Sequence, residues 1–201
     1  GVAPSAHAML GVGTPPAVTV KVTAAPAPGD DSVTVMSAGT WMTATDRTVT
    51  LLFDPEPGVA LTPSPVETLV GGRAEGVLVG GNIAMLASEV GSRNSLRAAA
   101  SIAVLEEIGE EAYRLDRLFT QLLRTGWFDE VLGVVLGTFT DCGLPASVRD
   151  LVVDRLAPLG VPLLWGAPIG HADRNLAFPY GVPAVLDADA GTLVLREAAL
   201  L

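Results

Sequence analysis

The amino-acid sequence predicts an α/β fold: a strand-rich N-terminal segment over residues 1–70, followed by alternating strands and helices over residues 71–201. The first 70 residues hold nine of the 15 prolines and only two basic residues, and they are rich in Thr, Val and Ala. Beyond residue 70 the apolar spacing alternates between short continuous runs and a helical period. With 201 residues, 49% of them hydrophobic, the chain is long enough to bury a sizeable core.

Three stretches of the N-terminal segment have the alternating or β-branched pattern of strands: residues 17–23, 32–36 and 48–53. Pro, Gly and Asp separate these stretches, as in turns and loops. We therefore expect strands and loops with little helix before residue 70, and a separate α/β domain from residue 71.

The first helix start of the α/β domain follows a short strand predicted at residues 76–79. Gly80 and Gly81 come next, and apolar residues then recur at helical spacing. Asn82 is the expected N-cap and Gly91 the expected end of this helix. Bare backbone N–H groups at such a start can hold an anion or a carboxylate, although paired glycines are commonly needed only for tight packing.

Further strands and helices alternate along the rest of the chain. Ser147, with Asp150 three residues later, predicts the start of a helix that ends at Pro158 and Gly160. The other expected elements are strands at 101–105, 131–136 and 161–165, a helix over 114–124 closed by Gly126, and a hairpin of 182–186 with 192–195.

Charge and residue usage exclude several classes of function. The 22 acidic and 12 basic residues give a net charge of −10, which repels phosphate backbones, so nucleic acid is not an expected partner. Cys142 is the single cysteine, expected to be a small buried residue, and with two histidines the chain offers few metal ligands. The longest apolar run, residues 131–139, is too short to cross a membrane as a helix. We expect no cofactor, no metal and no membrane as a partner.

A group of acidic residues follows the strand predicted at 101–105. Glu106 and Glu107 come directly after it, and Glu110 and Glu111 lie close behind. The last two fit a solvated helix N-terminus, where carboxylates interact favourably with the helix dipole. Glu106 adjoins a fully apolar strand and is expected to be partly removed from water, which makes it a candidate functional carboxylate.

His171 lies in a glycine-containing loop, residues 168–175, beyond the strand predicted at 161–165. A histidine beside glycine can approach a ligand closely, and an imidazole suits general-base work near neutral pH. An incidental loop position is the alternative. His7 has weaker support, because only a short apolar stretch follows it.

A serine nucleophile is not evident beside this acid and base. No G-x-S-x-G sequence occurs. The serines considered fall in proline-rich loops, on helix faces or at cap positions: Ser5, Ser37, Ser64, Ser88, Ser92, Ser95, Ser101 and Ser147. The residues alone therefore indicate an acid and a base without a nucleophile.

Three segments match the motifs of one known family in order and spacing. They are residues 76–82 (GVLVGGN), 105–117 (LEEIGEEAYRLDR) and 168–179 (PIGHADRNLAFP). The corresponding family patterns are G-x-L-V-G-G-N, L-E-D-V-G-E-x-x-Y-R-I-D-R and P-x-G-H-x-x-x-N-x-x-x-P. Over roughly residues 71–190, the chain thus resembles the C-terminal part of the LD-carboxypeptidase family of serine peptidases, which also contains the microcin C self-immunity hydrolases.

The resemblance implies a Ser-His-Glu triad with Glu106 as the acid and His171 as the base. The family has Asp where this chain has Glu107, a departure that we do not expect to disturb Glu106. In the family, the serine lies in a G-x-S-D turn of a preceding N-terminal domain, and that turn does not occur in this sequence. Residues 14–70 match the family poorly. We therefore expect the chain to be a C-terminal portion that is inactive alone and needs the domain carrying the serine.

Three functions remain open at this point. The first is release of terminal D-alanine from murein tetrapeptides in cytoplasmic peptidoglycan recycling, by an enzyme expected to be a homodimer. The second is a serine amidase like the microcin-immunity hydrolases, acting on aminoacyl-nucleotide conjugates, against which the acidic composition argues mildly. The third is a non-catalytic half that serves binding or dimerisation.

Overall fold

The computed structural model describes residues 19–20, 32–37, 40–45, 66–93, 95–173 and 175–197. The chain divides into two compact units, the first comprising Gly1–Pro55 and the second Glu56–Ala199. We describe each by itself.

The first unit contains a small antiparallel sheet. Its strands are β1 (Thr19–Val20), β2 (Ser32–Ser37) and β3 (Thr40–Thr45), in the order β1-β2-β3. Of the strands expected in this region, the one at 17–23 overlaps β1 at Thr19 and Val20, the one at 32–36 agrees with β2, and the one at 48–53 lies outside the described residues. β3 was not anticipated from the sequence.

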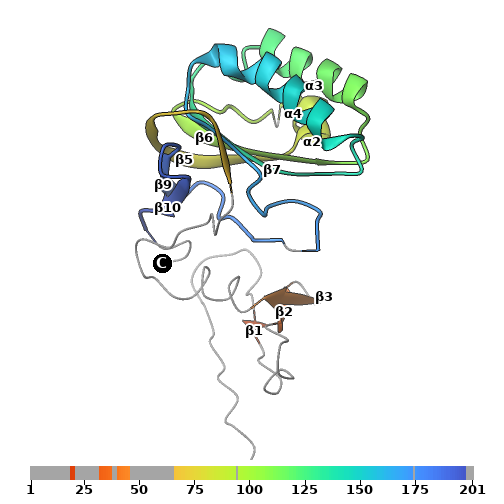
Figure 1. Ribbon diagram of the computed structural model, residues 1–201. Helices are drawn as coiled ribbons and strands as arrows, with labels where there is room; N and C mark the ends of the chain where they lie inside the picture. Colours follow the sequence, from red (N-terminus) through yellow and green to blue (C-terminus); the bar gives the residue numbers. More distant parts are fainter. Residues whose placement is uncertain are drawn as a thin grey trace, which may run out of the picture. The chain divides into compact units, whose positions relative to one another are not determined.

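The second unit is a seven-stranded mixed sheet with helices (Figure 1), which confirms the α/β fold class expected from the sequence. The strand order is β10-β9-β5-β6-β7-β8-β4. The strands are β4 (Glu67–Val70), β5 (Arg73–Asn82), β6 (Ser101–Ile108), β7 (Val131–Thr140), β8 (Leu163–Trp165), β9 (Pro183–Asp187) and β10 (Thr192–Leu195). The helices are α2 (Ile83–Glu89), α3 (Ala112–Arg124) and α4 (Pro145–Leu156), and a 3-10 turn, η1 (Ala157–Leu159), follows α4.

The centre of the sheet is parallel. β5, β6, β7 and β8 are neighbours in chain order, and α2, α3 and α4 connect them. Because each connection moves to the next strand in the same direction with the same hand, the helices gather on one face of the sheet (Figure 1). β6 is buried along almost its whole length, as is usual for a central parallel strand covered on both faces.

The hydrophobic core lies between the helices and the sheet. α3 contributes Leu115, Phe119 and Leu122, all fully buried, and its Gln121 side chain donates to the Ala87 carbonyl oxygen of α2 at 2.7 Å. α4 contributes Val148, Val152 and Leu156 to the same cluster. Burial of these apolar faces fixes the three helices on the sheet and so fixes the carboxyl ends of the parallel strands between them.

The sheet is curled, and close contacts on its other face show this. A Cβ on Gly133 of β7 would lie 2.8 Å from Leu186 Cδ2 of β9 and 3.2 Å from Ala74 Cβ of β5. The absence of a side chain at Gly133 therefore lets these strands approach across the inside of the curl. The turn after β9 also meets the opposite end of the sheet, since the Ala188 carbonyl oxygen accepts a hydrogen bond of 2.5 Å from Thr68 Oγ1 of β4.

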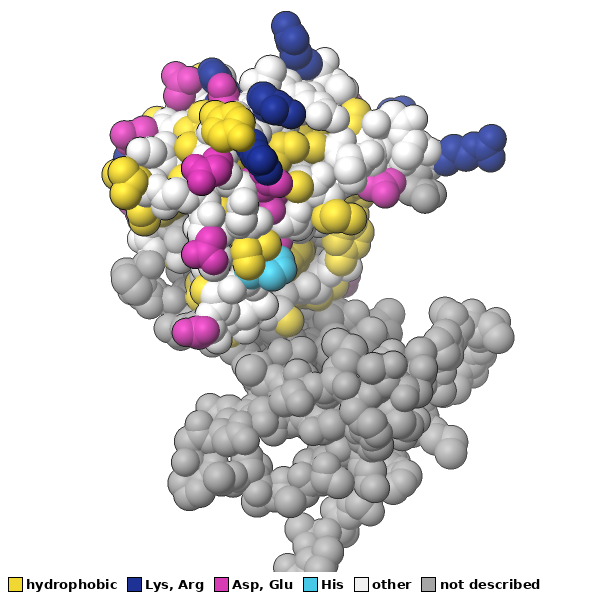
Figure 2. Space-filling view, turned by 90° about the vertical axis from the view of Figure 1, so that its right-hand side faces the viewer, with side chains coloured by type: hydrophobic (Ala, Val, Ile, Leu, Met, Phe, Trp, Pro, Cys, Tyr) yellow, Lys and Arg dark blue, Asp and Glu magenta, His cyan; other side chains and the backbone are white. Residues whose placement is uncertain are grey.

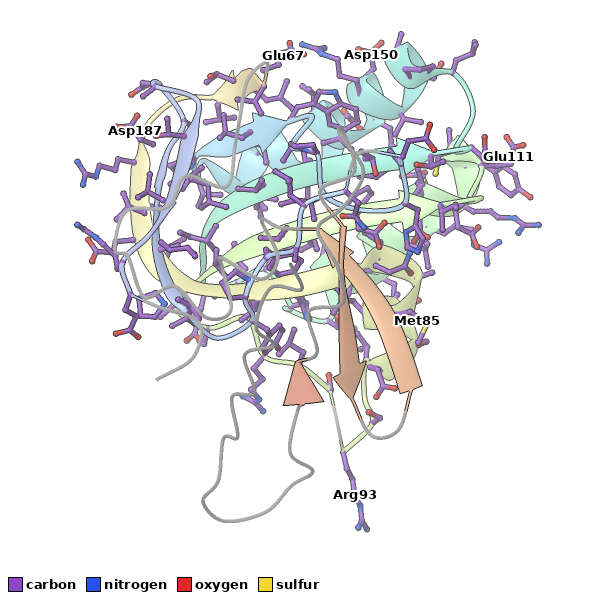
Figure 3. All side chains as sticks on the ribbon, turned by 90° about the horizontal axis from the view of Figure 1, so that it is seen from below. Glu67, Met85, Arg93, Glu111, Asp150 and Asp187 are labelled. Atoms are coloured by element: carbon purple, nitrogen blue, oxygen red, sulfur yellow. The ribbon has the colours of Figure 1, made fainter. Side chains whose placement is uncertain are left out.

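Figure 3 shows that edge strand β4 lies close to α4, with Glu67 near Asp150. Arg149 of α4 donates from Nε to both carboxylate oxygens of Glu67, at 3.1 and 3.0 Å. This ion pair is exposed, and it holds the pKa of Glu67 below its ordinary value of 4.5, mainly through the hydrogen bond from Arg149.

The structure corrects two details of the expected elements. Helix α4 begins at Pro145, with Leu144 as its N-cap, so Ser147 is inside the helix and does not cap it. Proline is well suited to the first helical position because its φ is preset and it lacks the N–H that would be unpaired there. The central strands are also longer than expected: β6 extends to Ile108, so Glu106 and Glu107 lie within the strand.

Candidate functional site

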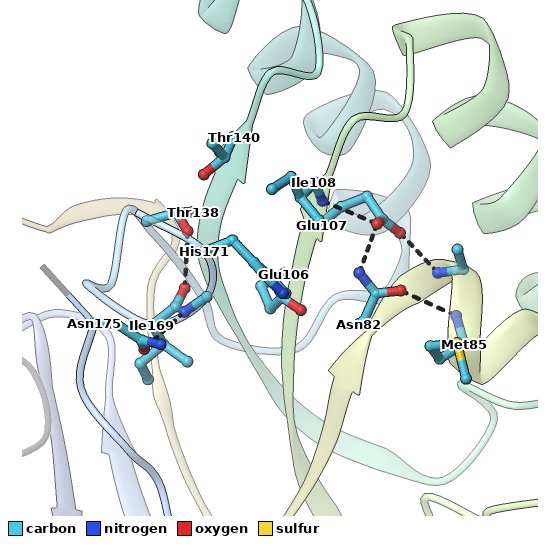
Figure 4. A network of polar contacts seen from close by, with 12 residues as sticks. Asn82, Met85, Glu106, Glu107, Ile108, Thr138, Thr140, Ile169, His171 and Asn175 are labelled. Atoms are coloured by element: carbon cyan, nitrogen blue, oxygen red, sulfur yellow. Dashed lines mark hydrogen bonds and ion pairs between the residues drawn. The ribbon is translucent and has the colours of Figure 1, made fainter. Parts of the chain in front are cut away.

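The candidate site lies at the carboxyl end of β6, where two neighbouring glutamates point to opposite faces of the sheet (Figure 4). Successive side chains alternate along a strand, so Glu106 and Glu107 enter different environments. Both are nearly inaccessible to water, with 6% and 2% of their surface exposed. A buried carboxylate must be hydrogen-bonded to be tolerated, and each of the two has its own partners.

Glu106 faces the loop that carries His171. Its Oε2 lies 2.7 Å from Nδ1 of the imidazole, which is the distance of a strong charge-assisted hydrogen bond. A carboxylate can only accept, so Nδ1 carries the proton and the lone pair of the neutral ring is on Nε2. The His171 side chain is 49% exposed, in contrast to its buried partner. The structure thus brings together the acid and the base that the sequence singled out.

Figure 2 shows the described histidine, His171, open to solvent on a face with several acidic side chains. Within the described parts of the chain, its partner carboxylate is the one supplied by Glu106. The accessible imidazole can accept or donate a proton at the surface. The buried carboxylate can stabilise the positive charge that the ring then carries.

Glu107 serves the fold on the other side of the strand. Its carboxylate accepts hydrogen bonds from Asn82 Nδ2 at 2.6 Å, from the backbone N–H of Ala84 at 2.7 Å and from its own neighbour Ile108 at 2.9 Å. Asn82 Oδ1 in turn accepts from the N–H of Met85 at 3.1 Å, which confirms Asn82 as the N-cap of α2. The helix start that could hold a carboxylate therefore holds one from the protein itself.

The paired glycines before α2 have different surroundings. Both have φ +132°, a conformation that favours glycine. A Cβ on Gly80 would lie 2.0 Å from the carbonyl oxygen of Val104 on β6, whereas a Cβ on Gly81 would meet nothing within 4 Å. Tight packing against β6 accounts for Gly80, and backbone conformation alone accounts for Gly81.

The remaining acidic residues of this region differ in exposure: Glu110 is half-buried and Glu111 is exposed. Glu110 forms an ion pair of 3.5 Å with Arg114, four residues later on α3. Glu111 is the N-cap residue of α3 but makes no side-chain cap hydrogen bond. Exposed Glu111 agrees with the solvated helix start expected from the sequence, whereas Glu110 is partly removed from water.

Cys142 is buried, as expected, and its thiol is free of a disulfide and donates to the Thr140 carbonyl oxygen at 3.3 Å; burial raises the pKa of this thiol. Two described serines are bonded to backbone carbonyls away from His171: Ser88 Oγ donates to Met85 and Ser101 Oγ to Ala98. His7 lies outside the described residues.

The described part of the chain contains no cluster of three or more His, Cys, Asp or Glu side chains placed to hold a metal ion. Within the same residues, no helix has the length and apolar character needed to cross a membrane.

One feature of the site has no counterpart among the residues singled out from the sequence. Leu105 of β6 pairs with Leu136 of β7, but Glu107 pairs with Phe139, so β7 has one additional residue opposite Glu106. Gly137 and Thr138 form this β-bulge. A Gly-Thr pair inside an otherwise apolar strand was the available signal, since glycine within a strand often marks a bulge.

The fold and the site together define a class of protein: an α/β protein in which a buried carboxylate is hydrogen-bonded to an accessible imidazole at the carboxyl ends of parallel strands. This arrangement of groups is typical of enzymes that use general acid–base chemistry. The family model of the LD-carboxypeptidase C-terminal domain matches residues 75–186, more than half of the chain. The chain therefore belongs to the LD-carboxypeptidase family, as its motifs indicated.

Curated relatives agree with this assignment. A murein tetrapeptide carboxypeptidase of Pseudomonas aeruginosa is 40% identical over 131 residues, which cover 62% of this chain and 43% of that protein. A Streptomyces coelicolor protein named as a carboxypeptidase is 47% identical over 150 residues, 74% of this chain and 48% of that protein. The chain spans about half the length of the curated relatives that it matches.

Solved structures show the same fold. The muramoyltetrapeptide carboxypeptidase from Oxalobacter formigenes superposes with a TM-score of 0.64 at 26% identity, over 76% of this chain and 53% of that one. An MccF-like protein from Bacillus anthracis gives a TM-score of 0.66 at 19% identity, over 76% of this chain and 55% of that one. At that identity the second likeness concerns the fold alone.

Proposed function

We propose that this chain is the acid–base portion of a serine LD-carboxypeptidase that releases terminal D-alanine from murein tetrapeptides. The observation that carries the proposal is the 2.7 Å contact between Glu106 Oε2 and His171 Nδ1. It fixes the tautomer in which Nε2, on the more exposed side chain, can accept a proton. The names of the murein peptide carboxypeptidases among the relatives support the substrate class.

In the proposed reaction, His171 Nε2 takes the proton from a serine hydroxyl while the serine oxygen attacks the carbonyl carbon of the terminal peptide bond. The C–N bond then breaks, and His171 returns the proton to the leaving amino group of D-alanine. Water repeats the sequence on the acyl-enzyme, giving the shortened peptide and regenerating serine. Glu106 keeps the imidazole oriented and stabilises its positive charge in both halves of the reaction.

The serine belongs, in this proposal, to a domain outside residues 71–201, as the family resemblance implies. Three serines of the described residues have other partners: Ser88 Oγ and Ser101 Oγ donate to the backbone carbonyls of Met85 and Ala98, and Ser92 Oγ donates to the carboxylate of Glu89. We therefore expect the 201-residue chain to have no acyl-transfer activity alone and the complete gene product to have it.

The test is D-alanine release from murein tetrapeptide by the complete gene product. Glu106→Gln and His171→Ala should each lower kcat by at least about 10³-fold, the scale of losing a triad member. Glu75→Gln is the matched carboxyl-to-amide control, because Glu75 is exposed on β5 outside the site. Absence of D-alanine release, or an unchanged rate in His171→Ala, would overturn the proposal.

Two further measurements separate the alternatives. Offering the same preparation an aminoacyl-nucleotide conjugate tests the microcin-immunity-like amidase, and a covalent serine probe that fails to label the complete protein would favour a non-catalytic half.

We also propose, from the family resemblance, that the complete protein is a cytoplasmic homodimer. Light scattering of the purified protein tests the dimer, and cell fractionation tests the localisation.

A further inference from the structure

The position of His171 depends on a connection between its loop and strand β7. Opposite Glu106, the bulge at Gly137 and Thr138 removes two residues from regular pairing with β6. A bulge re-aims backbone groups that would otherwise complete the ladder, and bulges are frequent beside active sites. Here the re-aimed group is the backbone N–H of Thr138, which donates to the carbonyl oxygen of Ile169 at 2.7 Å.

Thr138 contacts the same carbonyl a second time. Its Oγ1 donates to the Ile169 oxygen at 3.2 Å, so one residue of the bulge holds one point of the loop through two hydrogen bonds (Figure 4). The adjacent glycine makes room for this approach, because a Cβ on Gly137 would lie 2.2 Å from the Ile169 oxygen. Ile169 is two residues before His171, and its side chain is buried.

Between Ile169 and His171, the chain passes through a narrow space. Gly170 has φ +131°, and a Cβ there would lie 2.4 Å from Thr138 Oγ1 and 2.9 Å from Glu106 Oε2. The loop is closed on itself by Asn175, whose Oδ1 accepts from the N–H of Gly170 at 3.2 Å. A displacement of Ile169 would therefore also displace Gly170 and the imidazole of His171, because the loop has little room to absorb it.

We propose that Thr138 is a positioning residue: acting through the carbonyl of Ile169, its hydroxyl holds His171 on the carboxylate of Glu106. Any effect of Thr138 on catalysis rests on the proposed function, whereas its effect on the position of His171 does not. Thr138 does not contact the imidazole, so its contribution is to the fraction of time that the Nδ1–Oε2 hydrogen bond is formed.

Histidine imidazole N–H signals in proton–nitrogen NMR spectra of the 201-residue chain measure that fraction directly, through the exchange of the Nδ1 proton with water. His171→Ala assigns the signal. Thr138→Val keeps the backbone N–H and removes only the hydroxyl donor, and we expect the exchange to become about fivefold faster, the factor that corresponds to one hydrogen bond of about 1 kcal/mol. Thr138→Ala should do the same without placing a methyl group against Gly170.

Two variants make the result specific. Thr138→Ser restores the hydroxyl and should return the exchange rate to that of the wild type. Thr140→Val makes the same substitution two residues further along β7, at a side chain that makes no hydrogen bond within the described residues, and should leave the rate unchanged. The melting temperature of each variant shows whether it is folded.

Wild-type exchange in both Thr138→Val and Thr138→Ala would overturn the proposal, as would an equal acceleration in Thr140→Val or a failure of Thr138→Ser to restore protection. Release of D-alanine by the complete protein is measured separately. If that activity is absent while the exchange rates change as expected, the proposed function is wrong and the positioning role of Thr138 stands.

Discussion

Removal of the Glu107 carboxylate should destabilise the fold severely, although the residue makes no contact with His171. Glu107→Ala withdraws the acceptor of three N–H groups, those of Asn82, Ala84 and Ile108. A hydrogen bond to a charged group contributes about 1.5–3 kcal/mol, and a buried donor left without a partner has a cost of similar size. Since water can reach part of this region once the side chain is gone, we expect a loss of about 3–5 kcal/mol of unfolding free energy.

Urea denaturation followed by circular dichroism measures this loss, as a lower midpoint at an unchanged slope. Glu107→Gln keeps the shape but turns one acceptor into a donor that faces another donor, so an intermediate loss of about 2 kcal/mol is expected. Glu110→Ala is the control nearby, because its 3.5 Å ion pair joins it to the half-exposed side chain of Arg114 four residues later, and such pairs contribute little to stability.

A loss below about 1 kcal/mol in Glu107→Ala would refute this reasoning. It would mean that the three donors find water or other partners as readily as they find the carboxylate, and that the junction of β5, β6 and α2 does not depend on it.

Three other perturbations follow from single features. Gly170→Ala should abolish the protected imidazole signal because its Cβ would clash with Thr138, whereas Gly181→Ala, at φ +77° with nothing within 4 Å, should not. A thiol reagent should label Cys142 at least about tenfold more slowly in the native than in the urea-unfolded chain, since burial raises its pKa and excludes the reagent. Glu67→Gln should lower stability at neutral pH, and the difference from wild type should start to shrink as the pH falls through about 4.5 and be lost only below the folded-state pKa of Glu67, which is lower; a pH-independent difference would contradict this.

Local patterns in the sequence were enough to predict the α/β class and the separate parts of the site. Asn82 was identifiable as an N-cap because a capping side chain reaches only three residues along its own chain, to Met85. The apolar run before Glu106 indicated burial of that carboxylate, and the structure gives it 6% exposure. Such features depend on residues that are close in the sequence, so the local sequence pattern is enough to predict them.

Features that depend on pairing between distant segments were not predictable in this way. The bulge at Thr138 exists because β7 carries one more residue than β6 between two paired positions, and no local pattern states which residues will pair. The role of Glu107 was missed for the same reason: two of its donors come from Asn82 and Ala84, more than twenty residues earlier. The start of α4 was misplaced because a capping-box pattern at Ser147 was preferred over the proline two residues before it.

Because Glu106 and Glu107 point to opposite faces of the sheet, we expect two adjacent codons to be selected for different properties, activity at 106 and folding at 107. A library randomised at both positions could be sorted first by the amount of folded protein in cells and then by the D-alanine release that we propose for the complete protein. Substitutions at 107 should be lost in the first sort, since they remove an anchor of the fold. Substitutions at 106 that keep its size, such as glutamine, should pass the first sort and be lost in the second.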